Sequence, residues 1–160
     1  MARAATVTRA LPEKAASNDI AFGDFGELLG YRLRRAQAAV HRDFAGSVAG
    51  LDLTQKQAAI IWLIHGNPGV SQVAVAGALD MDRPTMMALT DRLELRGLIT
   101  RVRSTVDRRR QELHLTPDGR SLLAKLKKRI ARHEQRIREL FTPAELASFV
   151  SALDKLQRLG

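Results

Sequence analysis

The chain has 160 residues, of which 45% are hydrophobic and 27% are charged, so it can form one domain with an ordinary core. Its net charge is +9, and residues 101–138 hold 13 basic and 4 acidic residues, which accounts for the whole excess. An excess confined to one stretch is typical of a surface that binds a polyanion. The absence of cysteine excludes disulfides, thiol catalysis, thiolate zinc sites and a cysteine redox sensor.

The sequence gives no sign of a membrane or secretory segment. Residues 1–18 lack periodicity and contain Pro12, which predicts a disordered N-terminal arm, and residues 1–10 have no apolar core of a signal peptide. The longest uncharged stretch, 57–79, is broken by Gly66-Asn67-Pro68-Gly69, and its apolar run 58–64 is far shorter than the roughly 20 residues that a bilayer requires. We therefore expect a cytoplasmic protein.

From Asp19 onward, apolar residues recur every three or four positions. This spacing is typical of one apolar stripe on a helix, and Gly46 and Gly50 mark its end. We predict a long helix over 19–50, as part of a dimerisation layer. Its stripe consists of Phe22, Phe25, Leu29, Leu33, Ala36, Val40 and Phe44.

Three short helices follow, each preceded by a residue that favours helix N-caps. Thr54-Gln55-Lys56-Gln57 forms a capping box, and Pro84 is tolerated in the first turn of the third helix. The second and third helices are joined by a tight connection, as in a helix-turn-helix. The predicted caps and helices are Thr54 with a helix to Ile64, Ser71 with a helix to about Leu79, and Asp82 with a helix to Gly97.

The pattern then changes from helical to β spacing. Residues 98–103 and 112–116 are β-prone and flank a polar loop at 104–110, which predicts a β-hairpin. A helix restarts at Thr116-Pro117, and a second capping box, Thr142-Pro143-Ala144-Glu145, starts a last helix that runs to about Leu159. The helix between them carries a heptad-like seam formed by Leu123, Leu126, Ile130, His133, Ile137 and Leu140.

This order of elements predicts a mainly α fold. A helix-turn-helix followed by a basic hairpin, or wing, is a winged helix-turn-helix, which we assign to residues 51–116. The helices at 19–50 and 117–160 are extra to that module, and they suit a dimerisation layer.

The wing has the strongest chemical signal, with five arginines in ten residues. Guanidinium groups at this density repel one another unless an anion lies among them, and a narrow minor groove attracts inserted arginine. A solvated basic loop is the alternative. Asp107 is expected to pair with an arginine and hold the wing in shape. The expected DNA contacts are Arg101, Arg103, Arg108, Arg109 and Arg110.

The helix after Asp82 is the candidate recognition helix. Arg83 could read guanine or hold a phosphate, whereas Thr85, Met87 and Ala88 could contact thymine methyl groups. Ser71 and Gln72 could donate to phosphates. The alternative is that Met86 and Met87 are both packed, which we accept for Met86 and leave open for Met87. The expected DNA contacts on these two helices are Ser71, Gln72, Arg83, Pro84, Thr85, Met87 and Ala88.

Three motifs together resemble the MarR family: Leu93-Glu94-Leu95-Arg96-Gly97-Leu98-Ile99, Asp107-Arg108-Arg109, and Leu115-Thr116-Pro117-Asp118-Gly119. The resemblance covers roughly residues 20–158. It implies an obligate homodimer of winged helix-turn-helix subunits, usually a repressor that a small ligand releases from DNA. It also implies that Arg109 or Arg110 makes the minor-groove contact. The sequence departs from the family at Ala88, where many members carry a polar or basic residue.

Within the family, Asn67-Pro68-Gly69-Val70-Ser71-Gln72 and Leu28-Leu29-Gly30-Tyr31-Arg32-Leu33-Arg34-Arg35, among other stretches, resemble the branch that senses hydroxycinnamates or related aromatic acids, some as CoA thioesters. The resemblance implies a ligand pocket between the DNA-binding module and the dimer layer. Core packing is the alternative for Trp62, and a favourable helix-end position is the alternative for His65. The candidate ligand contacts are Phe25, Leu29, Tyr31, Arg32, Trp62 and His65.

The remaining basic block, Arg120–Arg138, has three possible roles. It could be a solvated face, it could attract DNA at long range, or it could hold the phosphates of a CoA-bearing ligand. The four histidines show no close metal-ligand spacing, and we find no nucleophile–base motif, so we expect no metal, no cofactor and no enzyme activity. The leading hypothesis is a ligand-responsive repressor on double-stranded DNA, and the alternative is a non-specific architectural DNA-binding protein without an effector.

Overall fold

The computed structural model describes residues 20–105 and 111–159, and it divides into two compact units, Met1–Arg35 and Ala36–Gly160. The predicted N-terminal arm (1–18) and the wing-tip residues Asp107, Arg108, Arg109 and Arg110 lie outside the described residues. The elements are, in chain order, η1 (Gly23–Glu27), α1 (Leu29–Ser47), α2 (Gln55–Gly66), β1 (Val70–Ser71), α3 (Gln72–Ala78), α4 (Arg83–Leu95), β2 (Ile99–Arg103), β3 (Gln111–Leu115), α5 (Pro117–Arg138), α6 (Pro143–Leu156) and η2 (Gln157–Leu159).

In the first unit, the long helix predicted from residue 19 begins only at Leu29, so the prediction was wrong at its N-terminal end. Gly23 has a φ of +47° and Leu28 has a ψ of 125°, and neither conformation is compatible with a continuous right-handed helix. The short 3₁₀ helix η1 lies between these two breaks. Because a 3₁₀ helix also places residues three apart on one face, the apolar spacing did not reveal the interruption.

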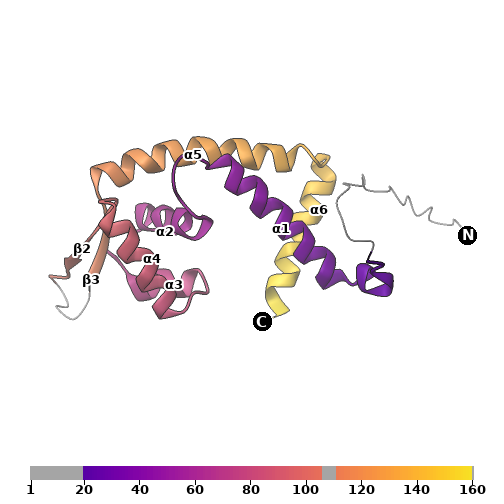
Figure 1. Cartoon of the computed structure of the whole chain (residues 1–160), viewed down its shortest axis with the longest axis horizontal. Coiled ribbons are helices and arrows are strands. Elements are labelled where there is room, and N and C mark those ends of the chain that lie inside the picture. Colours follow the sequence, from indigo (N-terminus) through magenta and orange to yellow (C-terminus); the bar gives the residue numbers. More distant parts are fainter. Residues whose placement is uncertain (1–19, 106–110, 160) are drawn as a thin grey trace, which may run out of the picture. The chain divides into compact units, whose positions relative to one another are not determined.

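In the second unit, α2 is the centre of the core. Figure 1 shows α2 between α5 on one side and the pair α3 and α4 on the other. The apolar side chains of α2 are buried against these helices, and Ile60, Ile61 and Ile64 are at most 1% exposed. The other largest fully buried side chains are Val75, Met86, Thr90, Leu93, Ile99, Leu113, Leu123 and Leu126.

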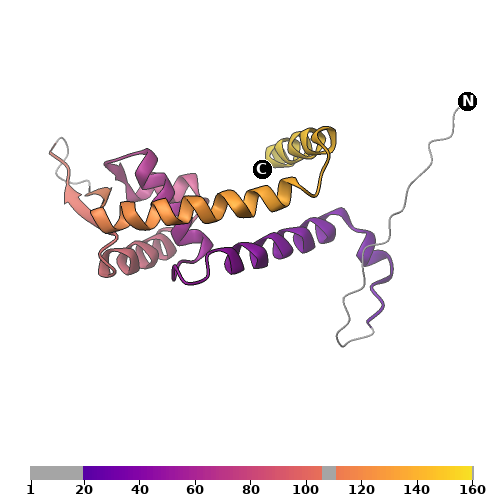
Figure 2. The ribbon, with the colours of Figure 1, turned by 90° about the horizontal axis from the view of Figure 1, so that it is seen from above.

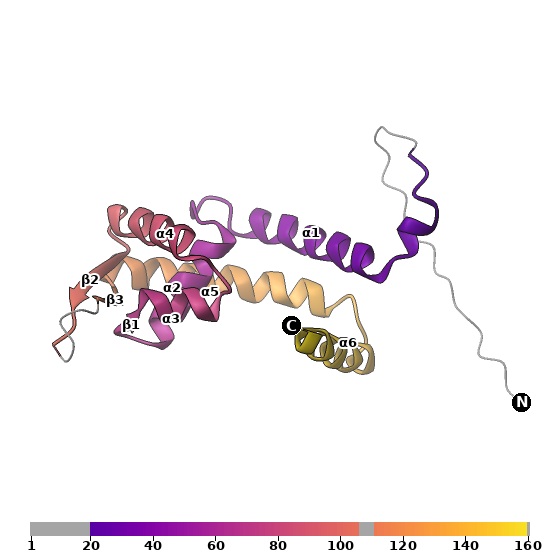
Figure 3. The same ribbon diagram turned by 90° about the horizontal axis from the view of Figure 1, so that it is seen from below.

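The predicted hairpin is confirmed as β2 and β3, but the sheet has a third strand that the sequence did not reveal. The strand order is β1-β3-β2 with antiparallel pairing, and Val70 pairs with Leu113 while Ile99 pairs with Leu115. Figure 3 shows β1 where the chain enters α3. A strand of two residues is too short to show the alternation by which strands are recognised in a sequence.

The apolar seam predicted on α5 has two different fates. Leu123 and Leu126, at 2% and 0% exposed, belong to the core of the helix-turn-helix domain rather than to an outer face. Leu140, predicted as the last seam residue, lies in the turn after α5 and is 76% exposed. Figure 2 shows that only the first half of α5 lies alongside α2, α3 and α4. None of the helices within residues 20–105 and 111–159 is long and apolar enough to cross a membrane.

A polar cluster joins the end of α1 to the second half of α5. The buried His133 places Nδ1 2.6 Å from Asp43 Oδ2, and Arg136 Nη2 donates to the same oxygen at 2.7 Å. Arg136 also donates to Ser47 Oγ at 2.6 Å, and the His133 ring packs edge-on against Phe44. The hydrogen bonds from Arg136 and His133 hold the pKa of Asp43 below its usual value. The predicted seam histidine is therefore an intramolecular partner of α1.

We expect Asp43→Asn to reduce stability at neutral pH and to matter less in acid. A carboxyl whose pKa is lowered by folding stabilises the protein above its unfolded pKa of about 3.9, and this contribution is lost as the pH falls through the lower folded value. Urea unfolding of both proteins, followed from pH 7 to below pH 4, measures the difference. A difference that stays constant across this range would contradict the role given to the ionised Asp43. The pKa values of Asp82 and Glu145 are also lowered, so these groups make the stability of both proteins depend on pH in the same way. The difference between the wild type and the variant therefore reports Asp43 alone.

Candidate nucleic-acid interface

Local hydrogen bonds fix the start of each helix of the helix-turn-helix. Ser71 Oγ accepts from the Ala74 amide at 3.2 Å and begins α3. Asp82 accepts from both the amide and the hydroxyl of Thr85 at 2.7 Å, which begins α4 and lowers the pKa of Asp82. Both predicted caps are confirmed. The Thr85 hydroxyl, which the sequence offered to DNA, is thus already bonded to Asp82.

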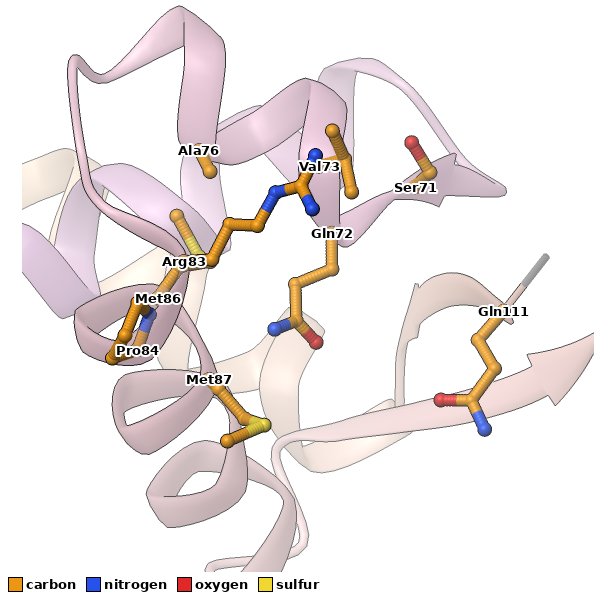
Figure 4. A pocket seen from close by; sticks show the side chains of 9 residues that line it. All are labelled: Ser71, Gln72, Val73, Ala76, Arg83, Pro84, Met86, Met87 and Gln111. Atoms are coloured by element: carbon orange, nitrogen blue, oxygen red, sulfur yellow. The ribbon is translucent and has the colours of Figure 1, made fainter.

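Five of the candidate DNA contacts, Ser71, Gln72, Arg83, Pro84 and Met87, line one open hollow between α3 and α4 with a volume of about 700 Å³, whereas Thr85 and Ala88 do not line it. Figure 4 shows Arg83 and Met87 from α4 and Gln72 from α3 around this space. Met87 is 56% exposed whereas Met86 is fully buried, so Met87 is available to a partner and Met86 is not. The lining residues are Ser71, Gln72, Val73, Ala76, Arg83, Pro84, Met86, Met87 and Gln111.

Three of the lining residues were missed by the sequence analysis: Val73, Ala76 and Gln111. Val73 is 59% exposed on α3, Gln111 is exposed at the start of β3, and Ala76 is buried. An apolar residue in the first turn of a helix gives no sign of exposure in the sequence, because the same residue type usually packs inward. Ala88 is exposed on α4 but does not line the hollow.

Arg101 differs from the other candidate DNA contacts, because its guanidinium is already paired. It lies 2.5 Å from Asp91 Oδ1 and 2.6 Å from Glu94 Oε2, and the side chain is 17% exposed. It also donates to Thr90 Oγ1 at 2.8 Å, so strand β2 is tied to helix α4. Two carboxylates compensate its charge within the protein. The DNA contact predicted for Arg101 stays a prediction, and these surroundings favour a structural role instead.

Of the other wing arginines, only Arg103 lies within the residues that the structure describes. Arg103 is exposed at the end of β2 and has no ion-pair partner among residues 20–105 and 111–159. The predicted contacts Arg108, Arg109 and Arg110, and the predicted structuring residue Asp107, remain predictions because they lie outside these ranges.

The candidate ligand residues of the first unit form a local aromatic group. The Tyr31 ring centroid lies 4.6 Å from that of Phe25 and 5.5 Å from that of Phe22, which the sequence analysis did not single out. Arg32 forms an ion pair with Glu27. Leu29 is 70% exposed.

The other two candidate ligand residues belong to α2 in the second unit. Trp62 is 39% exposed, so core packing, the alternative reading of this residue, is wrong. The ammonium of Lys127 lies 5.3 Å from the centroid of the indole, within the range of a cation–π contact. His65 is exposed in the last turn of α2, where a cation would face the negative end of the helix dipole.

A capped helix-turn-helix, followed by an antiparallel hairpin with basic residues, defines a winged helix-turn-helix DNA-binding protein. The model of the MarR family matches residues 50–110, which include the helix-turn-helix and the first strand of the wing, β2. The chain is 36% identical over 149 residues to a protein of Thauera aromatica named as a transcriptional regulatory protein for the hcr operon, with 91% of this chain and 90% of that protein covered.

Solved structures are similar over almost the whole chain. The transcriptional repressor CouR bound to a 23-mer DNA duplex is 41% identical with a TM-score of 0.81, covering 88% of this chain and 99% of that one. CouR bound to p-coumaroyl-CoA is 40% identical with a TM-score of 0.82, covering 89% and 100%. The PcaV regulator of Streptomyces coelicolor with its natural ligand is 29% identical with a TM-score of 0.78, covering 88% and 99%. The chain belongs to the MarR family of transcriptional regulators.

Proposed function

We propose that the protein is a homodimeric repressor that binds a pseudopalindromic operator and is released by a small aromatic acid or its CoA thioester. The observation that carries this proposal is the exposed hollow between α3 and α4, where Arg83, Met87 and Gln72 present a cation, an apolar group and an amide on one face. This mixture suits base edges and phosphates together. CouR, whose structures with DNA and with p-coumaroyl-CoA are 41% and 40% identical to this chain, supports both partners.

Each half of the dimer would place α4 in a major groove, with the two grooves about 10 base pairs apart. Ser71 and Gln72 would hold phosphates, while Arg83, Pro84, Thr85, Met87 and Ala88 would face the bases. Arg103, Arg108, Arg109 and Arg110 would contact the backbone or the minor groove, with Asp107 holding the wing in shape. Release requires only a ligand that prefers a state with misplaced recognition helices, with a coupling of about 1–3 kcal/mol.

The proposed effector contacts are those that the sequence indicated: Phe25, Leu29, Tyr31, Arg32, Trp62 and His65. Tyr31 and Phe25 form an aromatic group that a phenyl ring could join, and Arg32 could exchange Glu27 for the carboxylate of an aromatic acid. Trp62 offers an exposed indole with the Lys127 cation beside it. These features suit a flat, anionic ligand.

Fluorescence anisotropy on the DNA upstream of the chain's own gene tests the proposal, with scrambled duplex as competitor and with p-coumarate and p-coumaroyl-CoA as trial effectors. We expect tight binding to upstream DNA, weak competition by the scrambled duplex, and release by an aromatic acid or thioester. Equal affinity for both duplexes, with no response to either compound, would favour the architectural alternative.

The same assay tests the role of the hollow. We expect Arg83→Ala to weaken upstream binding by about 1–3 kcal/mol, which is roughly 5- to 150-fold. The matched control is Arg92→Ala, because Arg92 is exposed in the last turn of α4 and base contacts come from the N-terminal part of a recognition helix. Equal losses in the two variants would remove Arg83 from the base-contacting set.

A further inference from the structure

A second cleft lies between the end of α1 and the middle of α5, within the unit 36–160, and its volume is about 410 Å³. This size falls within the range of small-molecule sites. Its lining is polar and dominated by arginine. The residues are Arg42, Asp43, Gly46, Ser47, Arg129, Arg132 and Arg136.

The charges of the cleft are not balanced. Its one carboxylate, Asp43, already accepts from Arg136 and lies against His133. Arg129 donates to the carbonyl oxygens of Ser47 and Ala49, which fixes its position but leaves its charge uncompensated. Arg42 and Arg132 are exposed, and neither has a hydrogen bond or ion pair with any residue in 20–105 or 111–159. Four guanidinium groups around one satisfied carboxylate leave an excess of positive charge that favours an anion.

The chemistry of the lining favours phosphate over a single carboxylate. Guanidinium groups match the oxygens of carboxylate and phosphate alike, but four of them carry more positive charge than a single carboxylate can neutralise. Two of the four are held in place by the protein, while two are free to close on a ligand. The cleft also lies away from the DNA-facing hollow, because α2 separates α5 from α3 and α4 (Figure 1). An occupant of this cleft therefore does not have to be the DNA that α4 would contact.

We propose that this cleft binds the phosphate groups of the nucleotide portion of a CoA thioester effector. The proposal rests on the proposed function, in that it takes the effector to be a thioester rather than a free acid. It gives the basic block 120–138 a specific role, since three of the four arginines belong to it. Trp62, proposed above to contact the aromatic group, has its cationic partner Lys127 on the same helix α5. One helix would thus contact both ends of the ligand.

The test compares the wild-type dimer with Arg42→Ala/Arg132→Ala. Both side chains are exposed and have no described partner, so their loss is not expected to impair folding, and circular dichroism checks this. The matched control is Lys125→Ala/Lys128→Ala, which removes two exposed charges from the same helix but outside the cleft. The three probes for calorimetric titration are p-coumaroyl-CoA, free p-coumarate and adenosine 3′,5′-bisphosphate.

We expect the arginine variant to bind p-coumaroyl-CoA and the bisphosphate about 10- to 100-fold more weakly, with p-coumarate affinity and the control variant unchanged. Unchanged thioester binding by the arginine variant would overturn the proposal. So would a wild type that binds p-coumarate but neither phosphate-bearing probe, and in that case the proposed function would stand. Arginine-dependent binding of the bisphosphate, without release of DNA by any aromatic compound, would support the cleft and defeat the proposed function. A lower salt slope of operator binding in the arginine variant, with no loss of thioester affinity, would assign the cleft to DNA and overturn the proposal.

Discussion

Replacing Gly119 by alanine is expected to destabilise the folded protein by about 3 kcal/mol. Gly119 lies in the first turn of α5, where a Cβ would come 2.0 Å from the Leu98 carbonyl oxygen. That oxygen cannot move away easily, because it accepts from the Thr116 amide at 3.1 Å, and Thr116 caps α5. The extra methyl group would therefore push the start of α5 away from the strand that carries the wing.

The sign of this effect is informative, because glycine to alanine within a helix normally stabilises by up to about 1 kcal/mol. Gly77 in α3 is the matched control, since a Cβ there would meet no heavy atom of the described residues within 4 Å. Urea unfolding at one fixed protomer concentration measures both variants. Stability of Gly119→Ala within 1 kcal/mol of the wild type would contradict the close approach of α5 to Leu98.

This contact illustrates what the sequence could not predict. The side-chain N-caps of α2 to α6 were predicted, because such a cap depends on residues at most three positions apart. Thr54 and Gln57 exchange hydrogen bonds, as do Thr142 and Glu145. The approach of Gly119 to Leu98 and the pairing of β1 with β3 depend on residues far apart in the chain. Nothing in the local pattern encodes them. The late start of α1 is a third case, because a 3₁₀ turn keeps the apolar spacing of an α-helix.

The candidate interface was also predicted only in part. Arg83 and Met87 were named from the sequence as exposed positions of the candidate recognition helix. Gln72 was named as a phosphate donor at the start of the preceding helix. The structure places all three around one hollow. Arg101 was assigned to DNA because it belongs to a run of arginines. Composition does not reveal that two carboxylates of α4 lie within 3 Å of the Arg101 guanidinium.

That difference leads to a second prediction of large effect. Arg101→Met is expected to lower stability by about 1–3 kcal/mol, between the values for exposed and buried ion pairs, because Arg101 is 17% exposed while its partners are 49% and 38% exposed. Methionine keeps most of the apolar stem. The loss would leave the charges of Asp91 and Glu94 uncompensated on one face of α4. The bond from the backbone amide of residue 101 to Glu94 Oε1 would remain, but β2 would lose its side-chain ties to α4. We therefore expect weaker operator binding as well.

The salt dependence of operator binding separates this indirect effect from a lost phosphate contact. Each lost phosphate contact lowers the slope of log K against log salt by about 0.9. We expect Arg103→Ala, on the same strand and exposed, to lower the slope, whereas Arg101→Met lowers affinity at an unchanged slope. If Arg101→Met lowered the slope as Arg103→Ala does, Arg101 would be a DNA contact after all.

Adding Asp91→Asn and Glu94→Gln to Arg101→Met should recover part of the stability, because neutral partners no longer need the cation. Such recovery would show that the arginine acts by compensating these carboxylates, and that the position of the wing depends on a charge that DNA never contacts.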